Sequence, residues 1–66
     1  MKKNSSTSQW YKCRTAKVIS KDNAILLDII NADKYKVESD WIFIKDCYGT
    51  THHYPVKTVK KLETKE

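Results

Sequence analysis

The residues best suited to chemistry in this 66-residue chain are its two cysteines and two histidines. Cys13, Cys47, His52 and His53 would supply four sulfur and nitrogen ligands, the number that a structural zinc site uses. Their spacing argues against such a site, because the chain has no CxxC or HxxxH pair and adjacent strand residues point to opposite faces. We therefore expect no metal site and no cofactor.

One catalytic arrangement is open to the same residues. Cys47 and His52 could form a thiolate–imidazole pair across a hairpin. The sequence contains no identifiable third group to orient the histidine, no Gly-flanked serine and no glycine-rich phosphate loop. A chain this short also has little room for a substrate cleft beside its core. We predict that the protein is not an enzyme.

Aromatic and basic residues form a more informative pattern near the start of the chain. Trp10, Lys12 and Arg14 alternate, so an extended strand would place them on one face. Indole rings between cations suit single-stranded nucleic acid, because each base offers a stacking face and each phosphate a negative charge. The predicted nucleic-acid-binding residues are Trp10, Lys12, Arg14, Lys17, Tyr48, His53, Lys57, Lys60 and Lys61.

The distribution of charge supports this interpretation. The net charge is +5, made up of +6 over residues 1–21, −3 over 22–46 and +2 over 47–66. If the first and last strands lie side by side, the two basic ends form one positive patch that attracts polyanions. Only Arg14 is an arginine among 13 basic residues, which argues for attraction to the phosphate backbone rather than sequence-specific base recognition.

Hydrophobic patterning predicts a mostly β domain over residues 10–62. Strands are expected over 10–20, with a bend near 15–16, and over 24–30, 34–38, 41–44 and 50–56. We expect Trp41, Phe43 and Tyr54 to lie in the core. Turns are expected between the strands, and Pro55 marks an edge strand or its end. Val56, Val59 and Leu62 recur every three residues, which predicts a short C-terminal helical turn.

Residues 41–62, WIFIKDCYGTTHHYPVKTVKKL, resemble the C-terminal hairpin of SH3-like and LSm-like small β-barrels. In those families an apolar strand, an acid, a glycine-containing turn and a second strand lead to a proline or short turn and then a valine. The resemblance implies a small five-stranded curled sheet or an SH3-like or LSm-like barrel. Residues 35–40 lack the glycine usual in the family's bent strand, so an open sheet remains an alternative.

Both ends of the chain are predicted to lie outside the domain. Residues 1–9 are polar and basic and should form a flexible tail, and residues 63–66 should fray. Residues 1–9 also lack the apolar segment of a signal peptide, and no apolar run is long enough to span a bilayer. These features predict a cytoplasmic protein without a membrane partner. The lysine-rich composition is typical of AT-rich coding, as in a low-GC bacterium, its phages or a mobile element.

Two partner classes remain open from the sequence. The first is nucleic acid, bound without catalysis and without sequence preference. The alternative is a protein-interaction accessory module of the phage or mobile-element type, which would bind a host protein through an exposed edge strand or aromatic patch. The acidic middle and basic ends would also allow self-association, including a homodimer.

Overall fold

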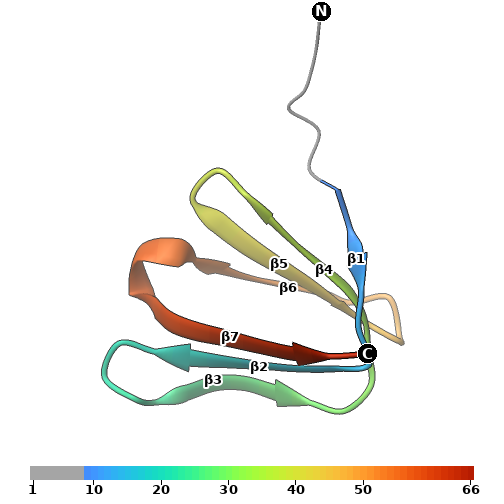
Figure 1. Ribbon diagram of the computed structural model, residues 1–66, viewed down its shortest axis with the longest axis horizontal. Helices are drawn as coiled ribbons and strands as arrows, with labels where there is room; N and C mark the ends of the chain where they lie inside the picture. The colour runs from blue at the N-terminus through green and yellow to red at the C-terminus, as the bar shows by residue number, and fades with distance from the viewer. Residues whose placement is uncertain (1–8) are drawn as a thin grey trace, which may run out of the picture.

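The computed structural model describes residues 9–66 and shows a chain built almost entirely of β-strands (Figure 1). The predicted tail over residues 1–9 lies outside the described residues apart from Gln9. Within the described part, the elements follow in the order β1 (Tyr11–Lys12), β2 (Thr15–Ser20), β3 (Ile25–Ile29), β4 (Ala32–Glu38), β5 (Trp41–Asp46), β6 (Thr51–Pro55), the 3-10 turn η1 (Val56–Thr58) and β7 (Val59–Lys65).

The strands form two antiparallel sheets. One has four strands in the order β1-β4-β5-β6, and the other has three in the order β3-β2-β7. The predicted β class is confirmed. The prediction of one five-stranded sheet or a closed barrel is corrected, because the strands divide between two sheets that do not close into a barrel.

Three hairpin turns depend on residues in the left-handed region of backbone conformation. Asn23, Ser39 and Gly49 have φ angles of 68°, 55° and 90°. Glycine adopts such angles without steric cost, and asparagine tolerates them better than most residues. These turns join β2 to β3, β4 to β5 and β5 to β6, so they fix which strands become neighbours.

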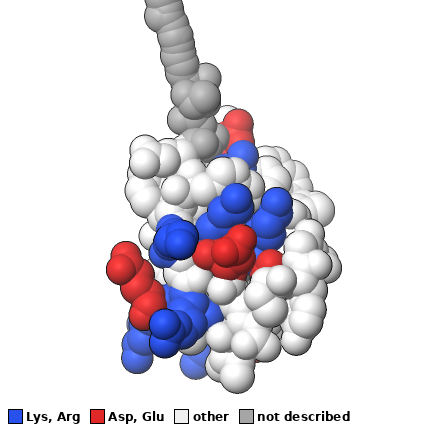
Figure 2. Space-filling view, turned by 90° about the vertical axis from the view of Figure 1, so that its right-hand side faces the viewer, with Lys and Arg blue, Asp and Glu red and all other residues white. Residues whose placement is uncertain are grey.

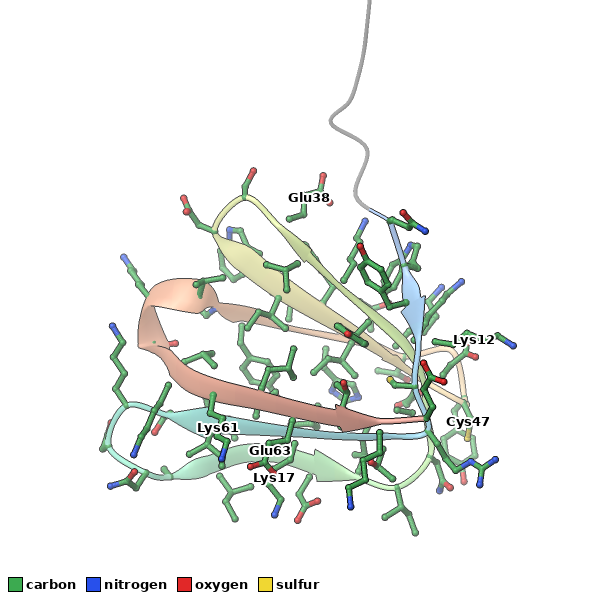
Figure 3. All side chains as sticks on the ribbon, viewed as in Figure 1. Lys12, Lys17, Glu38, Cys47, Lys61 and Glu63 are labelled. Atoms are coloured by element: carbon green, nitrogen blue, oxygen red, sulfur yellow. The ribbon has the colours of Figure 1, made fainter. Side chains whose placement is uncertain are left out.

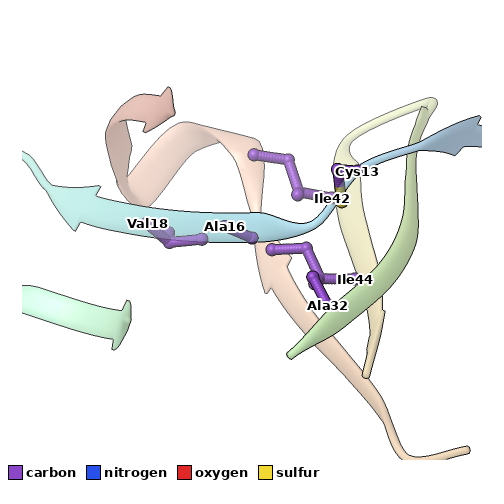
Figure 4. Close-up of a cluster of buried hydrophobic side chains, with 6 residues drawn as sticks. All are labelled: Cys13, Ala16, Val18, Ala32, Ile42 and Ile44. Carbon is purple, nitrogen blue, oxygen red and sulfur yellow. The ribbon is translucent and has the colours of Figure 1, made fainter. Parts of the chain in front are cut away.

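The core lies between the inner faces of the two sheets (Figure 4). Val18 of β2 and Ile44 of β5 are its largest fully buried side chains. Complete burial of an aliphatic side chain of this size contributes about 1.5–3 kcal/mol. The hydroxyl of Tyr54 on β6 donates a hydrogen bond of 3.2 Å to the Leu26 carbonyl oxygen beside it, which links the two sheets. The buried cluster consists of Cys13, Ala16, Val18, Ala32, Ile42 and Ile44.

The first predicted strand is divided between the two sheets. β1 pairs with β4, whereas β2 pairs with β3 and β7. The chain crosses at Cys13 and Arg14, whose N–H groups donate to the carbonyl oxygens of Asp33 (3.2 Å) and Lys65 (2.6 Å). The sequence predicted a bend two residues later, so the expectation that Trp10, Lys12 and Arg14 share one continuous strand is corrected.

The C-terminal end also differs from the prediction. The short helical turn is present as η1, but Val59 and Leu62 belong to β7. Residues 63–65, which were expected to fray, pair with β2. β6 lies at the edge of its sheet and ends at Pro55, as predicted. The long pairing of β7 with β2 therefore brings the two basic ends of the described chain together.

Candidate functional site

The outer face of the four-stranded sheet carries the densest group of basic side chains near an aromatic ring. Lys34 and Lys36 flank Tyr35, which packs against the core, along β4, and Lys45 follows the buried Ile44 on β5. In the antiparallel register Lys34 lies opposite Lys45, and Lys36 lies opposite Phe43. Alternation and pairing together place these side chains on one surface.

Trp10 lies over this group of lysines. The ammonium nitrogens of Lys36, Lys34 and Lys45 are 4.7, 5.2 and 5.7 Å from the centre of the indole ring. A cation this close to a tryptophan face is attracted by the ring's quadrupole, by about 0.5–1 kcal/mol at an exposed site. The indole thus has three cations close to its ring, and Trp10 as a whole is half-buried.

Only part of this positive charge is neutralised within the protein. Lys36 forms an ion pair of 3.1 Å with Glu38. Among residues 9–66 the other ion pairs are Lys61–Glu63 and His52–Asp46, so neither Lys34 nor Lys45 has an acidic partner. Lys34 and Lys45, both half-buried residues, therefore remain beside Trp10 without an acidic partner among the described residues.

Aromatic rings continue from this group across the sheet. Lys36 lies 5.3 Å from the Phe43 ring, and the Phe43 and His53 rings are 6.2 Å apart. His53 is in turn 5.4 Å from Trp41. We call this surface the aromatic–lysine face, and it comprises Trp10, Lys12, Lys34, Lys36, Glu38, Trp41, Phe43, Lys45 and His53. The expectation that Trp41 and Phe43 lie in the core is wrong, since Trp41 is 41% exposed and Phe43 packs on this outer surface, whereas Tyr54 does pack against the core.

Of the predicted binding residues, three lie on the aromatic–lysine face. They are Trp10, Lys12, which pairs in register with Lys34, and His53. Lys57 lies on η1, beside a hollow that Trp41 also lines. Arg14 lies near Lys12 at the end where β1 meets the C-terminus, where Figure 2 shows basic side chains around a small acidic group.

The remaining predicted residues lie elsewhere. Tyr48 is 80% exposed in the β5–β6 turn. Lys60 donates a hydrogen bond of 2.7 Å to the Asn23 side chain in the β2–β3 turn. Lys17 and Lys61 lie on the outer face of the three-stranded sheet, away from Lys12 (Figure 3). The structure therefore separates the predicted residues into several groups.

The predicted patch from the two basic ends is not formed as expected. β2 and β7 do pair, but Lys17 lies opposite Asp28 on one side and Glu63 on the other. Lys61 forms a 2.8 Å ion pair with Glu63, which raises the pKa of Lys61 and lowers the pKa of Glu63. Trp10 is on the other sheet. These lysines are interleaved with carboxylates, so they attract a polyanion less than their number indicates.

Sequence reasoning missed Lys34, Lys36, Lys45, Phe43 and Trp41 as candidate binding residues. The segment charge concealed the three lysines, because the carboxylates of residues 22–46 outnumber them. The alternation of Lys34 and Lys36 already indicated that they share a face. Two features could not be read from the sequence. One is the register of β4 and β5, which places Lys45 beside Lys34, and the other is the path of the chain that places Trp10 over these lysines.

The residues first considered for catalysis do not come together as a pair. Nε2 of His52 lies 3.1 Å from Oδ2 of Asp46, while Cys47 is exposed in the turn. Cys13 is a buried free thiol, whose pKa is raised by burial and by the nearby charge of Asp33. Within residues 9–66, no cluster of three or more His, Cys, Asp or Glu side chains could hold a metal ion.

Asp46, the last residue of β5, holds the β5–β6 turn together by hydrogen bonds. Its Oδ1 accepts hydrogen bonds of 2.9 Å from the N–H groups of Tyr48 and Thr50, and Oδ2 faces His52. The hydrogen bond from Thr50 is the main reason that the pKa of Asp46 lies below its usual value, and His52 and Tyr48 contribute further. This carboxylate thus stabilises the hairpin that carries Phe43 and His53.

Comparison with known proteins yields no relative. No family model matches the chain, and no curated protein or solved structure matches it either. In the part of the chain that the structure describes, there is no helix with the length and apolar character needed to cross a membrane.

Proposed function

We propose that the protein binds single-stranded nucleic acid through the aromatic–lysine face, without catalysis and with little dependence on sequence. One observation carries the proposal: three lysine ammonium groups lie within 6 Å of the Trp10 ring, and two of them have no acidic partner within the described residues. A single-stranded nucleic acid supplies phosphates to the two unpaired lysines and flat bases that stack on the Trp10 ring.

The proposal gives the lysines and the aromatic rings different roles in binding. Lys12, Lys34 and Lys45 neutralise phosphates, while Trp10, Phe43 and Trp41 offer rings for bases. A duplex would keep its bases stacked inside, so only an unpaired strand can use the rings. Lysine rather than arginine at these positions favours charge attraction over base recognition.

The test measures binding of a labelled, mixed-sequence single-stranded DNA of ten nucleotides by fluorescence anisotropy at several salt concentrations. Each phosphate contact to a single strand contributes about 0.7 to the slope of log K against log salt. Replacing Lys34 and Lys45 by Ala should therefore reduce the magnitude of this slope by about 1.4 and weaken binding strongly at low salt.

The matched control replaces Lys17 and Lys61 by Ala, which removes the same charge from the three-stranded sheet. This variant should retain most of the affinity, because both lysines already face carboxylates. The proposal is overturned if the unmodified protein does not bind at low salt, or if the two double variants lose affinity equally.

A second candidate function rests on β3. This strand is an edge of the three-stranded sheet, and Ile25 at its start and Ile30 just after its end are 59% and 73% exposed. Exposed apolar edge strands are sites at which another chain can add a strand. This candidate proposes self-association through β3. Sedimentation of the protein and of an Ile30→Lys variant tests it: a dimer lost in the variant supports it, and a monomer at all concentrations rejects it.

A further inference from the structure

An open hollow lies at the end of the aromatic–lysine face farthest from Trp10 along the strip of rings. It has a volume of about 430 Å³ and lies between the β4–β5 turn and η1. Figure 1 draws these two segments on its left side. Its volume is within the range of small-ligand pockets. Asp40, Trp41, Pro55, Val56 and Lys57 line it.

We propose that this hollow is a subsite for one unpaired nucleobase and that it prefers guanine. The inference rests on the proposed function and deepens it, because it assigns a base preference to one position of an otherwise unselective surface. The aromatic–lysine face leads directly to the hollow, since Trp41 belongs to both and lies 5.4 Å from His53.

The walls of the hollow are held in place by the fold. Trp41 pairs with Pro55 across β5 and β6. The Val56 N–H donates a 2.7 Å hydrogen bond to the Asp40 carbonyl oxygen, which ties η1 to the β4–β5 turn. The Thr58 hydroxyl donates to the Pro55 carbonyl oxygen at 2.9 Å. A base therefore enters a site whose backbone is already ordered, which lowers the entropic cost of binding.

The lining of the hollow combines apolar and charged residues. Trp41 and Val56 remain 41% and 37% exposed, and they offer apolar surface to the flat face of a base. Asp40 and Lys57 supply opposite charges at the same site. Within residues 9–66, the Asp40 carboxylate takes part in no ion pair, so it is available to a ligand.

The preference for guanine follows from the chemistry of Asp40. An ionised carboxylate only accepts hydrogen bonds, and its two oxygens can accept two parallel ones. The Watson–Crick edge of guanine has two adjacent donors, N1–H and the N2 amino group. Adenine and cytosine offer one amino donor beside an acceptor nitrogen, and thymine has one N–H between two carbonyl oxygens. Lys57 can pair with the O6 atom or with the neighbouring phosphate.

The experiment uses labelled DNA octamers of thymine that carry a single G, A or C at the fourth position, together with the all-thymine octamer. The unmodified protein should bind the guanine octamer at least about fivefold more tightly than the all-thymine octamer, as one bidentate contact provides. Asp40→Asn should abolish this preference, because an amide presents only one acceptor oxygen, while affinity for the all-thymine octamer stays the same or rises.

Asp28→Asn is the matched control, since it removes an exposed carboxylate from the three-stranded sheet and should leave the preference intact. Melting curves verify that both variants are folded. Equal affinity of the unmodified protein for all four octamers overturns the inference but not the proposed function, and so does a guanine preference that survives in Asp40→Asn. Failure of every octamer to bind at low salt overturns both.

Discussion

The outer faces of the two sheets carry similar numbers of lysines but arrange them differently. On the three-stranded sheet, Lys17 lies opposite Asp28 and Glu63, and Lys61 is bonded to Glu63. On the four-stranded sheet, Lys34 lies opposite Lys45, and Trp10 covers both. Cross-strand pairing, rather than the total charge of a segment, therefore determines whether a basic surface is free to attract a polyanion.

Removing the indole ring of Trp10 should have the largest effect on nucleic-acid binding. Trp10→Ala should weaken binding of a single-stranded oligonucleotide by roughly 1–3 kcal/mol, the usual contribution of one stacked base. Its melting temperature should change little, because Trp10 lies outside the buried core. Anisotropy titrations and thermal melts measure the two quantities.

Tyr48→Ala is the control for this substitution, because Tyr48 is an aromatic residue that is 80% exposed but lies in the β5–β6 turn. It should bind like the unmodified protein. If Trp10→Ala instead unfolds the protein, or if Tyr48→Ala weakens binding as much, then Trp10 has no special place in the interface.

Replacing Glu63 should make the outer face of the three-stranded sheet more like the aromatic–lysine face in its attraction for a polyanion. Glu63 lies among Lys61, Lys17 and Lys65, and its pKa is lowered mainly by the hydrogen bond from Lys61 and further by the charges of the three lysines. Glu63→Gln leaves these lysines without their shared partner and should raise affinity for a polyanion by about twofold to fivefold at low salt. Titration at 20 mM and 200 mM salt measures the change, which should vanish at the higher concentration. An unchanged low-salt affinity would show that Glu63 does not restrain this face.

Acid should weaken the hairpin that supports the aromatic–lysine face. The pKa of Asp46 lies below its usual value of 3.8, mainly because of the Thr50 hydrogen bond. Because its pKa is lowered in the folded state, the ionised Asp46 carboxylate contributes to the free energy of unfolding. This contribution is complete above about pH 4 and is lost as the pH falls through the lowered pKa. Urea unfolding at pH 6, 4 and 3 should show this loss.

Asp46→Asn should be less stable at pH 6 and should depend less on pH over the same range, because it has no carboxylate to protonate there. Parallel loss of stability in both proteins between pH 4 and pH 3 would mean that other carboxylates account for the acid sensitivity.

The two cysteine thiols should differ in their reactivity, which can be measured without any substitution. Cys47 is exposed in the turn, whereas Cys13 is buried where the chain crosses between sheets, and burial raises its pKa. In the folded protein Cys47 should react with a thiol reagent at least about a hundredfold faster than Cys13. Two equal rates without denaturant would contradict the burial of Cys13.

Much of the strand pattern could be predicted because it depends on local signals. Asn23 and Gly49 mark turns by their backbone preferences, and Pro55 ends an edge strand because it has no N–H to donate. The orientation of Trp41 and Phe43 could not be predicted. Four consecutive apolar residues have no period that identifies the buried pair, and the core uses Ile42 and Ile44 instead.

The candidate site was less predictable than the strands, because it depends on contacts between distant parts of the chain. Trp10, Lys12 and His53 were identified from their types. Lys34 and Lys45 were not, because they belong to an acidic segment and become a cationic pair only through the register of β4 and β5. Charge counted along the chain therefore predicted a basic surface at a different place from the aromatic–lysine face.

Under the proposed function, the aromatic–lysine face, and not the three-stranded sheet, contacts the nucleic acid. Backbone NMR spectra recorded during titration with a single-stranded DNA of ten nucleotides distinguish the two surfaces. The largest shifts are expected on Trp10, Lys34, Phe43, Lys45 and His53. Shifts concentrated on Lys17, Lys61 and Glu63, or none at low salt, would contradict the proposed function.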